Sequence, residues 1–217
     1  PGTLIANMTT AGTFTPPAGV TLVDVVVIGG GGNGATAGQD VCGGGGGGQV
    51  VVGRNVPVSG PVEIIIGGQQ SPTSFGSLSA LPGGDGKQWA PGISPNPLGR
   101  GNGGTGGNAH TPASAGPTVN GTHYAGGGGG FDYRTMSGQA FGGGGAGGGG
   151  NSWSVDANGY NKARNGAAGT GGGGGGGYNG SNPYDQPGAG LGGSGRVMIY
   201  TEQTLLSTLD LLADTAP

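Results

Sequence analysis

The stretch from Val25 to Gly32 reads Val-Val-Val-Ile-Gly-Gly-Gly-Gly, and it joins the two kinds of segment from which the chain is built. Its first half is a β-branched segment, which is typical of a strand buried on both faces. Its second half is a glycine run, and glycine loses more backbone freedom on ordering than any other residue. Further glycine runs occupy residues 43–48, 126–130, 142–145, 147–150 and 171–177. These runs are therefore either disordered or ordered by an unusual backbone arrangement.

The composition decides between these two interpretations. The 217 residues include 62 Gly and 15 Pro, which by itself is a composition of low-complexity disorder. Disordered chains are usually highly charged, however, whereas only 8% of these residues are charged and the net charge is −3. We therefore expect the chain to fold. Disorder stays the physical alternative, and a cooperative thermal transition in circular dichroism would exclude it.

Strand-forming segments gather at the two ends of the chain. We expect strands at residues 12–15, 20–28, 49–56 and 62–66, a further candidate at 74–79, and a closing strand at 195–200, with a polar lead before residue 12. Residues 12–81 hold 19 Val, Ile and Leu, whereas the longer stretch 85–190 holds four. That second stretch nevertheless carries nine of the twelve aromatic residues. Aromatics among Gly, Ser and Asn are typical of binding loops.

The glycine-rich part can be ordered without a side-chain core. A threefold extended helix rises about 3.1 Å per residue and packs closely when it is built of glycine. Such helices, called polyglycine II, hydrogen-bond to one another and add weak Cα–H contacts, so the backbone groups are satisfied. The predicted fold class is β-rich with a polyglycine II helix bundle: a small β-sandwich-like base carries a slab of packed helices with long loops, and almost no α-helix is expected except a short C-terminal one.

The same reasoning divides the chain into four parts. Residues 1–84 form the β-rich base with the first glycine runs, and residues 85–194 form the polyglycine II slab with aromatic display loops. Residues 195–200 add the closing strand of the base. Residues 201–217 form a C-terminal docking tail.

Several of these segments together resemble a known family. Residues 14–21 (Phe-Thr-Pro-Pro-Ala-Gly-Val-Thr), 25–32, 43–52, 74–76 and 193–200 resemble the glycine-rich proteins of tailed bacteriophages, over about residues 12–200. These include the T-even-type tail-fibre tip adhesins, whose glycine motifs form a packed polyglycine II bundle. The resemblance implies that hypervariable loops joining the helices contact a receptor on the bacterial outer membrane. Unlike those adhesins, the chain shows no separate N-terminal fibre-docking domain.

Aromatic residues in the polar loops are the candidate receptor-binding residues. Rings at such positions can stack on sugars or fill clefts between receptor loops, although some aromatics are expected to cover the glycine slab instead. The candidates are Trp89, Tyr124, Tyr133, Trp153, Tyr160, Tyr178 and Tyr184.

The tail after residue 200 differs in character from the rest. Leu205, Leu209 and Leu212 follow helical spacing, and Thr201 or Thr204 is placed to cap the helix. A Leu-rich helix here packs on the sheet or docks a partner. We favour docking to the virion.

The sequence contains partial motifs for catalysis or cofactor binding, but the neighbouring residues that each motif requires are missing. Residues 29–34 satisfy G-x-G-x-x-G after a strand, but no helix follows, and Gly86-Lys87 lacks the rest of a phosphate-binding loop. His110 and His123 have no catalytic or zinc partners at workable spacing, and Cys42 is interpreted as a small buried residue. We expect no enzyme, no cofactor and no metal. Neither a membrane span nor a signal peptide is expected.

These observations predict a bacteriophage receptor-binding adhesin of a tail fibre or spike, made in the host cytoplasm and located at the tip of the fibre on the virion. Its partners would be a bacterial outer-membrane protein or surface glycan, and other fibre or tail proteins. The seven Lys and Arg residues are scattered, which argues against a nucleic-acid partner. The alternatives are a virion decoration or fibre-scaffold protein and a polyglycine II antifreeze protein. Whether the working unit is a monomer or a homotrimer stays open.

Overall fold

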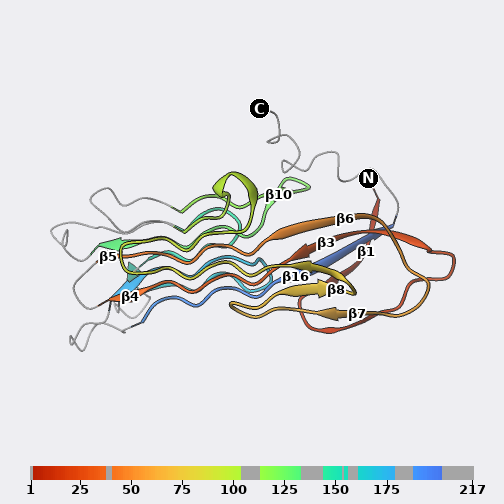
Figure 1. Ribbon diagram of the computed structural model, residues 1–217, viewed down its shortest axis with the longest axis horizontal. Coiled ribbons are helices and arrows are strands. Elements are labelled where there is room, and N and C mark those ends of the chain that lie inside the picture. The colour runs from red at the N-terminus through yellow and green to blue at the C-terminus, as the bar shows by residue number, and fades with distance from the viewer. Residues whose placement is uncertain are drawn as a thin grey trace.

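The structure is a computed structural model that describes residues 2–37, 41–103, 113–132, 144–152, 154–155, 161–178 and 188–201. Figure 1 shows an elongated molecule with the larger strands at one end and extended segments running from them to the other end. The described residues are rich in strands, and their only helical element is a 3-10 turn, η1 (Pro97–Gly99). The expectation of a β-rich fold with almost no α-helix is confirmed for this part of the chain.

Two four-stranded antiparallel sheets form the larger end, here called the sandwich. The first sheet has the order β1 (Thr3–Met8), β16 (Arg196–Thr201), β3 (Leu22–Ile28) and β6 (Val50–Pro57). The second has the order β2 (Gly12–Phe14), β7 (Val62–Ile65), β8 (Thr73–Phe75) and β9 (Leu78–Ala80). The closing strand predicted at the end of the sequence is thus β16, which lies in the middle of its sheet.

Two strand predictions need correction. The segment before residue 12 is not a polar lead, because β1 pairs with β16 from Thr3 opposite Thr201 to Met8 opposite Val197. Its mixed apolar and polar residues suit an edge strand, whose pattern is weaker than that of a buried one. The candidate strand at 74–79 is instead a hairpin, because Phe75 pairs with Leu78 across a tight turn.

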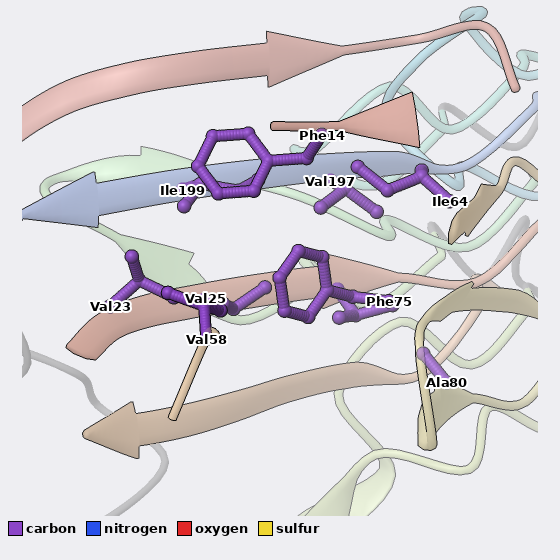
Figure 2. Packing of buried hydrophobic residues seen from close by; sticks show 10 residues of the cluster. Phe14, Val23, Val25, Val58, Ile64, Phe75, Ala80, Val197 and Ile199 are labelled. Carbon is purple, nitrogen blue, oxygen red and sulfur yellow. The ribbon is translucent and has the colours of Figure 1, made fainter. Parts of the chain in front are cut away.

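The hydrophobic core lies between the two sheets. It includes the alternate residues Val23, Val25 and Val27 of β3. Figure 2 shows Val23 and Val25 beside Phe14 and Phe75 of the second sheet. The two phenyl rings lie 6.1 Å apart between centroids and are tilted by 53°, a favourable aromatic arrangement. Each such buried side chain contributes about 1.5–3 kcal/mol to folding. The other buried members of this core are Val58, Ile64, Ala80, Val197 and Ile199.

The opposite face of the first sheet is also covered. Val26 and Ile28 are fully buried there among a second apolar cluster. A hairpin of β10 (Thr118–Val119) and β11 (Thr122–His123) contributes Val119 to this cluster. The hairpin turns at Asn120 and Gly121, whose φ angles of 50° and 77° fit the left-handed pair of a two-residue hairpin turn. The prediction that the late half of β3 is buried on both faces is confirmed.

The extended segments beyond the sandwich are here called the glycine bundle, defined as residues 29–35, 43–48, 83–93, 101–103, 126–130, 144–150, 163–177 and 188–195. Short strand pairs lie among the described residues next to these segments. They are β4 (Thr36–Ala37) with β15 (Gly177–Tyr178), β5 (Val41–Cys42) with β12 (Phe131–Asp132), and β13 (Ser154–Val155) with β14 (Asn161–Lys162). In Figure 1 the labelled β4 and β5 mark the end of the molecule away from the sandwich, here called the far end.

Hydrogen bonds within the glycine bundle repeat every three residues. Every third N–H of residues 29–35 donates to the segment 43–49, through the pairs Gly29 to Gln49, Gly32 to Gly46 and Ala35 to Gly43. Gly31 and Gly34, between them, donate instead to Gly193 and Gly190. The residues of one segment therefore point in turn to different neighbouring segments.

The run 171–177 follows the same rule. Its members Gly174 and Gly177 donate to Gly32 and Ala35, so it runs parallel to the segment 29–35. Gly45 and Gly48 donate to Gly174 and Gly171, so it runs antiparallel to the segment 43–48. The bundle thus mixes both chain directions, and these glycine runs satisfy their backbone groups through neighbouring segments.

Close approach explains why the central segments are glycine throughout. A Cβ atom on Gly45 would overlap the carbonyl of Gly32, and one on Gly128 would overlap that of Gly174. All residues of the runs 43–48, 126–130 and 171–177 are buried. Every side of these runs is occupied by another backbone, which leaves no room for a side chain.

Candidate functional site

A tight backbone hairpin at the surface of the glycine bundle carries the best described candidate site. Residues 83–93, here called the display hairpin, double back so that Gly84 donates to Ile93 at 2.9 Å and Lys87 donates to Ala90 at 2.8 Å. The turn between the two arms consists of Gln88 and Trp89. The hairpin needs no side-chain core because its arms are held through the backbone.

The display hairpin is anchored to the glycine bundle along its length. Gly46 donates to Gly84 and Gly92 donates to Gly44, so both arms lie against the central run 43–48. At the turn, the N–H of Trp89 donates to the carbonyl of Val41 at 3.1 Å. Because Val41 belongs to β5, this bond places the turn at the far end of the molecule (Figure 1).

Trp89 combines exposure with backbone strain. Its side chain is 54% exposed, and its φ angle is 66°. This left-handed conformation is uncommon for a bulky residue and costs on the order of 1–3 kcal/mol. Such outliers cluster at functional sites, where the surrounding structure holds them in place. An exposed indole held on an anchored turn can contact a partner with little further loss of entropy.

A shallow open groove runs along the same hairpin. Its volume is about 540 Å³, and it is lined by Gly84, Asp85, Lys87, Ala90, Pro91 and Ile93. Ile93 is 60% exposed. One oxygen of the Asp85 carboxylate accepts the N–H of Asn33 at 2.8 Å, and the other accepts the side-chain amide of Gln70. The groove therefore offers a ligand apolar walls together with the Lys87 ammonium and the Asp85 carboxylate, whose formal charges cancel.

Sequence reasoning missed Lys87 and Ile93 as members of this site. In the sequence, Lys87 stands out only within an incomplete phosphate-binding motif, and Ile93 is one of the four aliphatic residues of the stretch 85–190. The available signal was an isolated Ile beside Pro91 in a glycine-rich segment, where no hydrophobic core exists to bury it.

The structure places Tyr124 in a different environment from Trp89. Tyr124 packs against the second apolar cluster of the sandwich, and its hydroxyl lies 3.7 Å from the sulfur of Met198. The Arg196 guanidinium lies 5.8 Å from the centre of its ring, within the range of a cation–π contact. Trp89 therefore lies at the far end of the bundle, whereas Tyr124 lies on the side next to the sandwich.

A neighbouring phenol belongs to the same junction. Tyr200 is 7% exposed, and its hydroxyl lies 3.4 Å from the amide nitrogen of Asn120. Burial raises the pKa of the Tyr200 phenol, and the nearby Tyr124 adds to this, while the hydrogen bond from Asn120 and the charge of Arg196 act in the opposite direction. The junction is therefore a packed contact between sheet and hairpin.

The remaining aromatic candidates are less fully described. Tyr178 belongs to β15, where it pairs with Ala37 of β4 at the far end. Tyr133, Trp153, Tyr160 and Tyr184 lie outside the described residues, as do the tail residues Leu205, Leu209 and Leu212. Their proposed roles stay predictions.

The described residues show neither a metal-binding cluster nor a helix that could span a membrane. No group of three or more His, Cys, Asp and Glu residues within them is arranged to hold a metal ion. Cys42 is fully buried, as predicted. A ring nitrogen of His123 lies 2.8 Å from the carbonyl of Gly116, a structural contact within a loop. None of the described helical segments has the length and apolar character to span a bilayer.

Comparison with known proteins adds no assignment, because no protein-family model and no curated protein matches this chain.

Proposed function

We propose that this chain is a non-enzymatic receptor-binding adhesin of a bacteriophage virion, carried on a tail fibre or spike. The sequence resemblance to glycine-rich phage proteins supports this proposal. The division into an apolar sandwich and a side-chain-poor bundle supports it as well, because such a bundle can hold surface loops at a distance from the base.

We also propose that the glycine bundle is a slab of polyglycine II helices. The three-residue period of the hydrogen bonds supports it, because polyglycine II has three residues per turn and bonds only to neighbouring helices. The close backbone packing around Gly45 and Gly128 agrees with the same geometry. The loops that join the helices would then form the receptor-binding end.

The exposure and the backbone conformation of Trp89 are the observations that best support the proposed function. Trp89 is an exposed, strained tryptophan on a turn that hydrogen-bonds to the far end of the bundle. Tryptophan is enriched among residues that dominate binding energy at protein interfaces. An exposed indole on an anchored turn at the far end is therefore well placed to contact a partner.

Adsorption measurements test this proposal. Phage particles carrying Trp89→Ala should adsorb to susceptible bacteria about 30-fold more weakly, because truncating a central aromatic contact typically costs at least about 2 kcal/mol. Leu98→Ala is the matched control, since Leu98 is also exposed, at 68%, and has a left-handed φ of 57° in η1 outside the hairpin. Assembly should be normal in both variants.

The purified chain gives the complementary test. It should bind susceptible cells directly and compete with phage adsorption. A chain that is found on the particle but neither binds cells nor competes would contradict the adhesin proposal and favour the decoration or scaffold alternative. Thermal hysteresis in the purified protein would instead indicate the antifreeze alternative.

A further inference from the structure

Asparagine followed directly by glycine recurs along this chain, and the pair has a chemistry of its own. Asparagine is a thermolabile residue, because the backbone nitrogen of the next residue can attack its side-chain amide carbon. A glycine in that next position has no Cβ to hinder the attack. The described residues contain four such pairs, which begin at Asn33, Asn102, Asn120 and Asn165. The same two residues therefore occur in four described environments.

In three of the four pairs, both reacting groups are held by hydrogen bonds. The asparagine side-chain oxygen accepts a backbone N–H, which fixes the amide carbon. These bonds run to Asn33 from Gly192 at 2.9 Å, to Asn102 from Ser94 at 2.8 Å and to Asn165 from Leu191 at 3.0 Å. The N–H of the following glycine also donates to a carbonyl of another segment. The donors are Gly34, Gly103 and Gly166, and their acceptors are Gly190, Gly92 and Leu191.

Close packing adds to the protection of these three pairs. A Cβ on Gly34, Gly103 or Gly166 would overlap a backbone carbonyl of another segment. The nitrogen of such a glycine cannot turn toward the preceding side chain without displacing that segment. Local opening of the bundle must therefore precede reaction at these pairs.

The fourth pair, Asn120 and Gly121, lies in the exposed turn between β10 and β11. A Cβ on Gly121 would meet nothing within 4 Å, and none of the described residues accepts a hydrogen bond from the Gly121 N–H. The Asn120 amide is held only by its contact with the Tyr200 hydroxyl at 3.4 Å, which is longer than the usual range of about 2.7–3.2 Å. Nucleophile, amide and access to water thus coincide at this pair.

We propose that Asn120 deamidates spontaneously in the folded protein, ahead of the other three described pairs. The Gly121 nitrogen forms a bond to the Asn120 Cγ and gives its proton to the amide nitrogen, which leaves as ammonia. Water then opens the resulting cyclic imide at either carbonyl, which produces aspartate or isoaspartate. Water is the only co-reactant, and nothing is oxidised or reduced.

The reaction alters the contact between the hairpin and the first sheet. Val119, directly before the pair, is 2% exposed and belongs to the second apolar cluster. Aspartate keeps the length of the main chain. Isoaspartate routes the main chain through the side chain, which lengthens the turn and disturbs the pairing of Val119 with Thr122. The isoaspartate form therefore covers the sheet less well.

Peptide mapping by mass spectrometry tests the site. The purified full-length chain is incubated in mildly alkaline buffer below its melting temperature. The Asn120 peptide should deamidate at least about tenfold faster than the Asn33, Asn102 and Asn165 peptides, a ratio that corresponds to an opening free energy of about 1.4 kcal/mol at the protected pairs. In the chemically denatured chain, which is the control, the four rates should converge. Equal rates in the folded chain, or an Asn120 that reacts only after denaturation, would overturn the proposal.

Thermal melts test the structural effect. Asn120→Asp carries the aspartate product alone and should melt close to the unmodified chain. The isoaspartate form, separated chromatographically from incubated protein, should melt at least about 2 °C lower. Equal melting of the two forms would overturn the effect assigned to the lengthened turn. None of these outcomes depends on whether the chain binds bacteria.

Discussion

The Asn96 side chain hydrogen-bonds to the backbone where a glycine run continues into a strand: its side-chain oxygen accepts the N–H of Val50 at 2.8 Å. Its amide nitrogen donates to the carbonyl of Gly48 at 2.8 Å. Val50 begins β6, and Gly48 ends the central glycine run. Asn96 is 5% exposed, so one buried side chain satisfies two backbone groups, the Val50 N–H and the Gly48 carbonyl.

Removing the Asn96 side chain should destabilise the protein. Asn96→Ala leaves a buried donor and a buried acceptor unpaired, and we expect a loss of about 2–4 kcal/mol in the free energy of unfolding. Asn165→Ala is the matched control, because Asn165 makes one comparable bond, to the N–H of Leu191, from an exposed position. Chemical denaturation compares the two, and equal effects would contradict the role assigned to Asn96.

Replacing a glycine should destabilise the protein in the central segments of the bundle but not at an open surface position. Gly45→Ala drives a methyl group into the Gly32 carbonyl, and we expect a loss of more than about 2 kcal/mol. A Cβ on Gly60, by contrast, meets open space, and Gly60→Ala should be neutral or stabilising by up to about 1 kcal/mol. Thermal unfolding measures both, and a harmless Gly45→Ala would show that the bundle is not packed as described.

The stability of the protein should fall in alkaline solution because of Tyr200. Its folded-state pKa is raised above the ordinary value of 10.0, so above that pH the unfolded chain releases a proton that the folded chain still holds. The stabilisation that Tyr200 gives the folded state is fully present below pH 10 and is lost as the pH rises toward the folded pKa. Over that range the free energy of unfolding falls by at most about 1.4 kcal/mol per pH unit. Tyr200→Phe should reduce this slope between pH 9 and 11. An unchanged slope would assign the effect to other groups.

The loop aromatics outside the described residues give a prediction of their own. Trp153→Ala and Tyr184→Ala should impair adsorption without loss of particle assembly. Reduced incorporation of the variants into particles would point to a scaffold role instead.

The C-terminal tail is predicted to dock the protein on the virion through Leu205, Leu209 and Leu212. Deleting residues 203–217 should therefore prevent incorporation into particles, as measured by immunoblotting of purified virions. Normal incorporation of the truncated chain would refute the docking role.

The sequence was most informative where side chains carry the pattern. The β-branched run Val25 to Ile28 predicted a strand buried on both faces, and its alternate residues do face two different apolar clusters. One segment of the glycine bundle also shows a pattern, in which side chains are placed three residues apart. In the outer segment 188–195, Leu191 is exposed and Ser194 is partly exposed, three residues apart, while the glycines between them approach other segments closely.

The neighbours of each glycine run could not be predicted. Glycine has no side chain to mark a face or a register, so nothing in the residues 171–177 indicates that they lie parallel to 29–35 and antiparallel to 43–48. The strain at Trp89 was equally hidden, because φ depends on how the turn is anchored to Val41 and not on the residue itself. Lys87 and Ile93 gather in one groove only because the display hairpin folds back.

The central position of β16 sets the order in which the molecule can be assembled. β16 lies between β1 and β3, so the first sheet stays divided until residues 196–201 have left the ribosome. Pairings that span nearly the whole chain form slowly, because a large loop must close before they stabilise anything. Until then β1 has no partner in the sheet and β3, although paired with β6, keeps one open edge, and such exposed edges make a chain prone to aggregate.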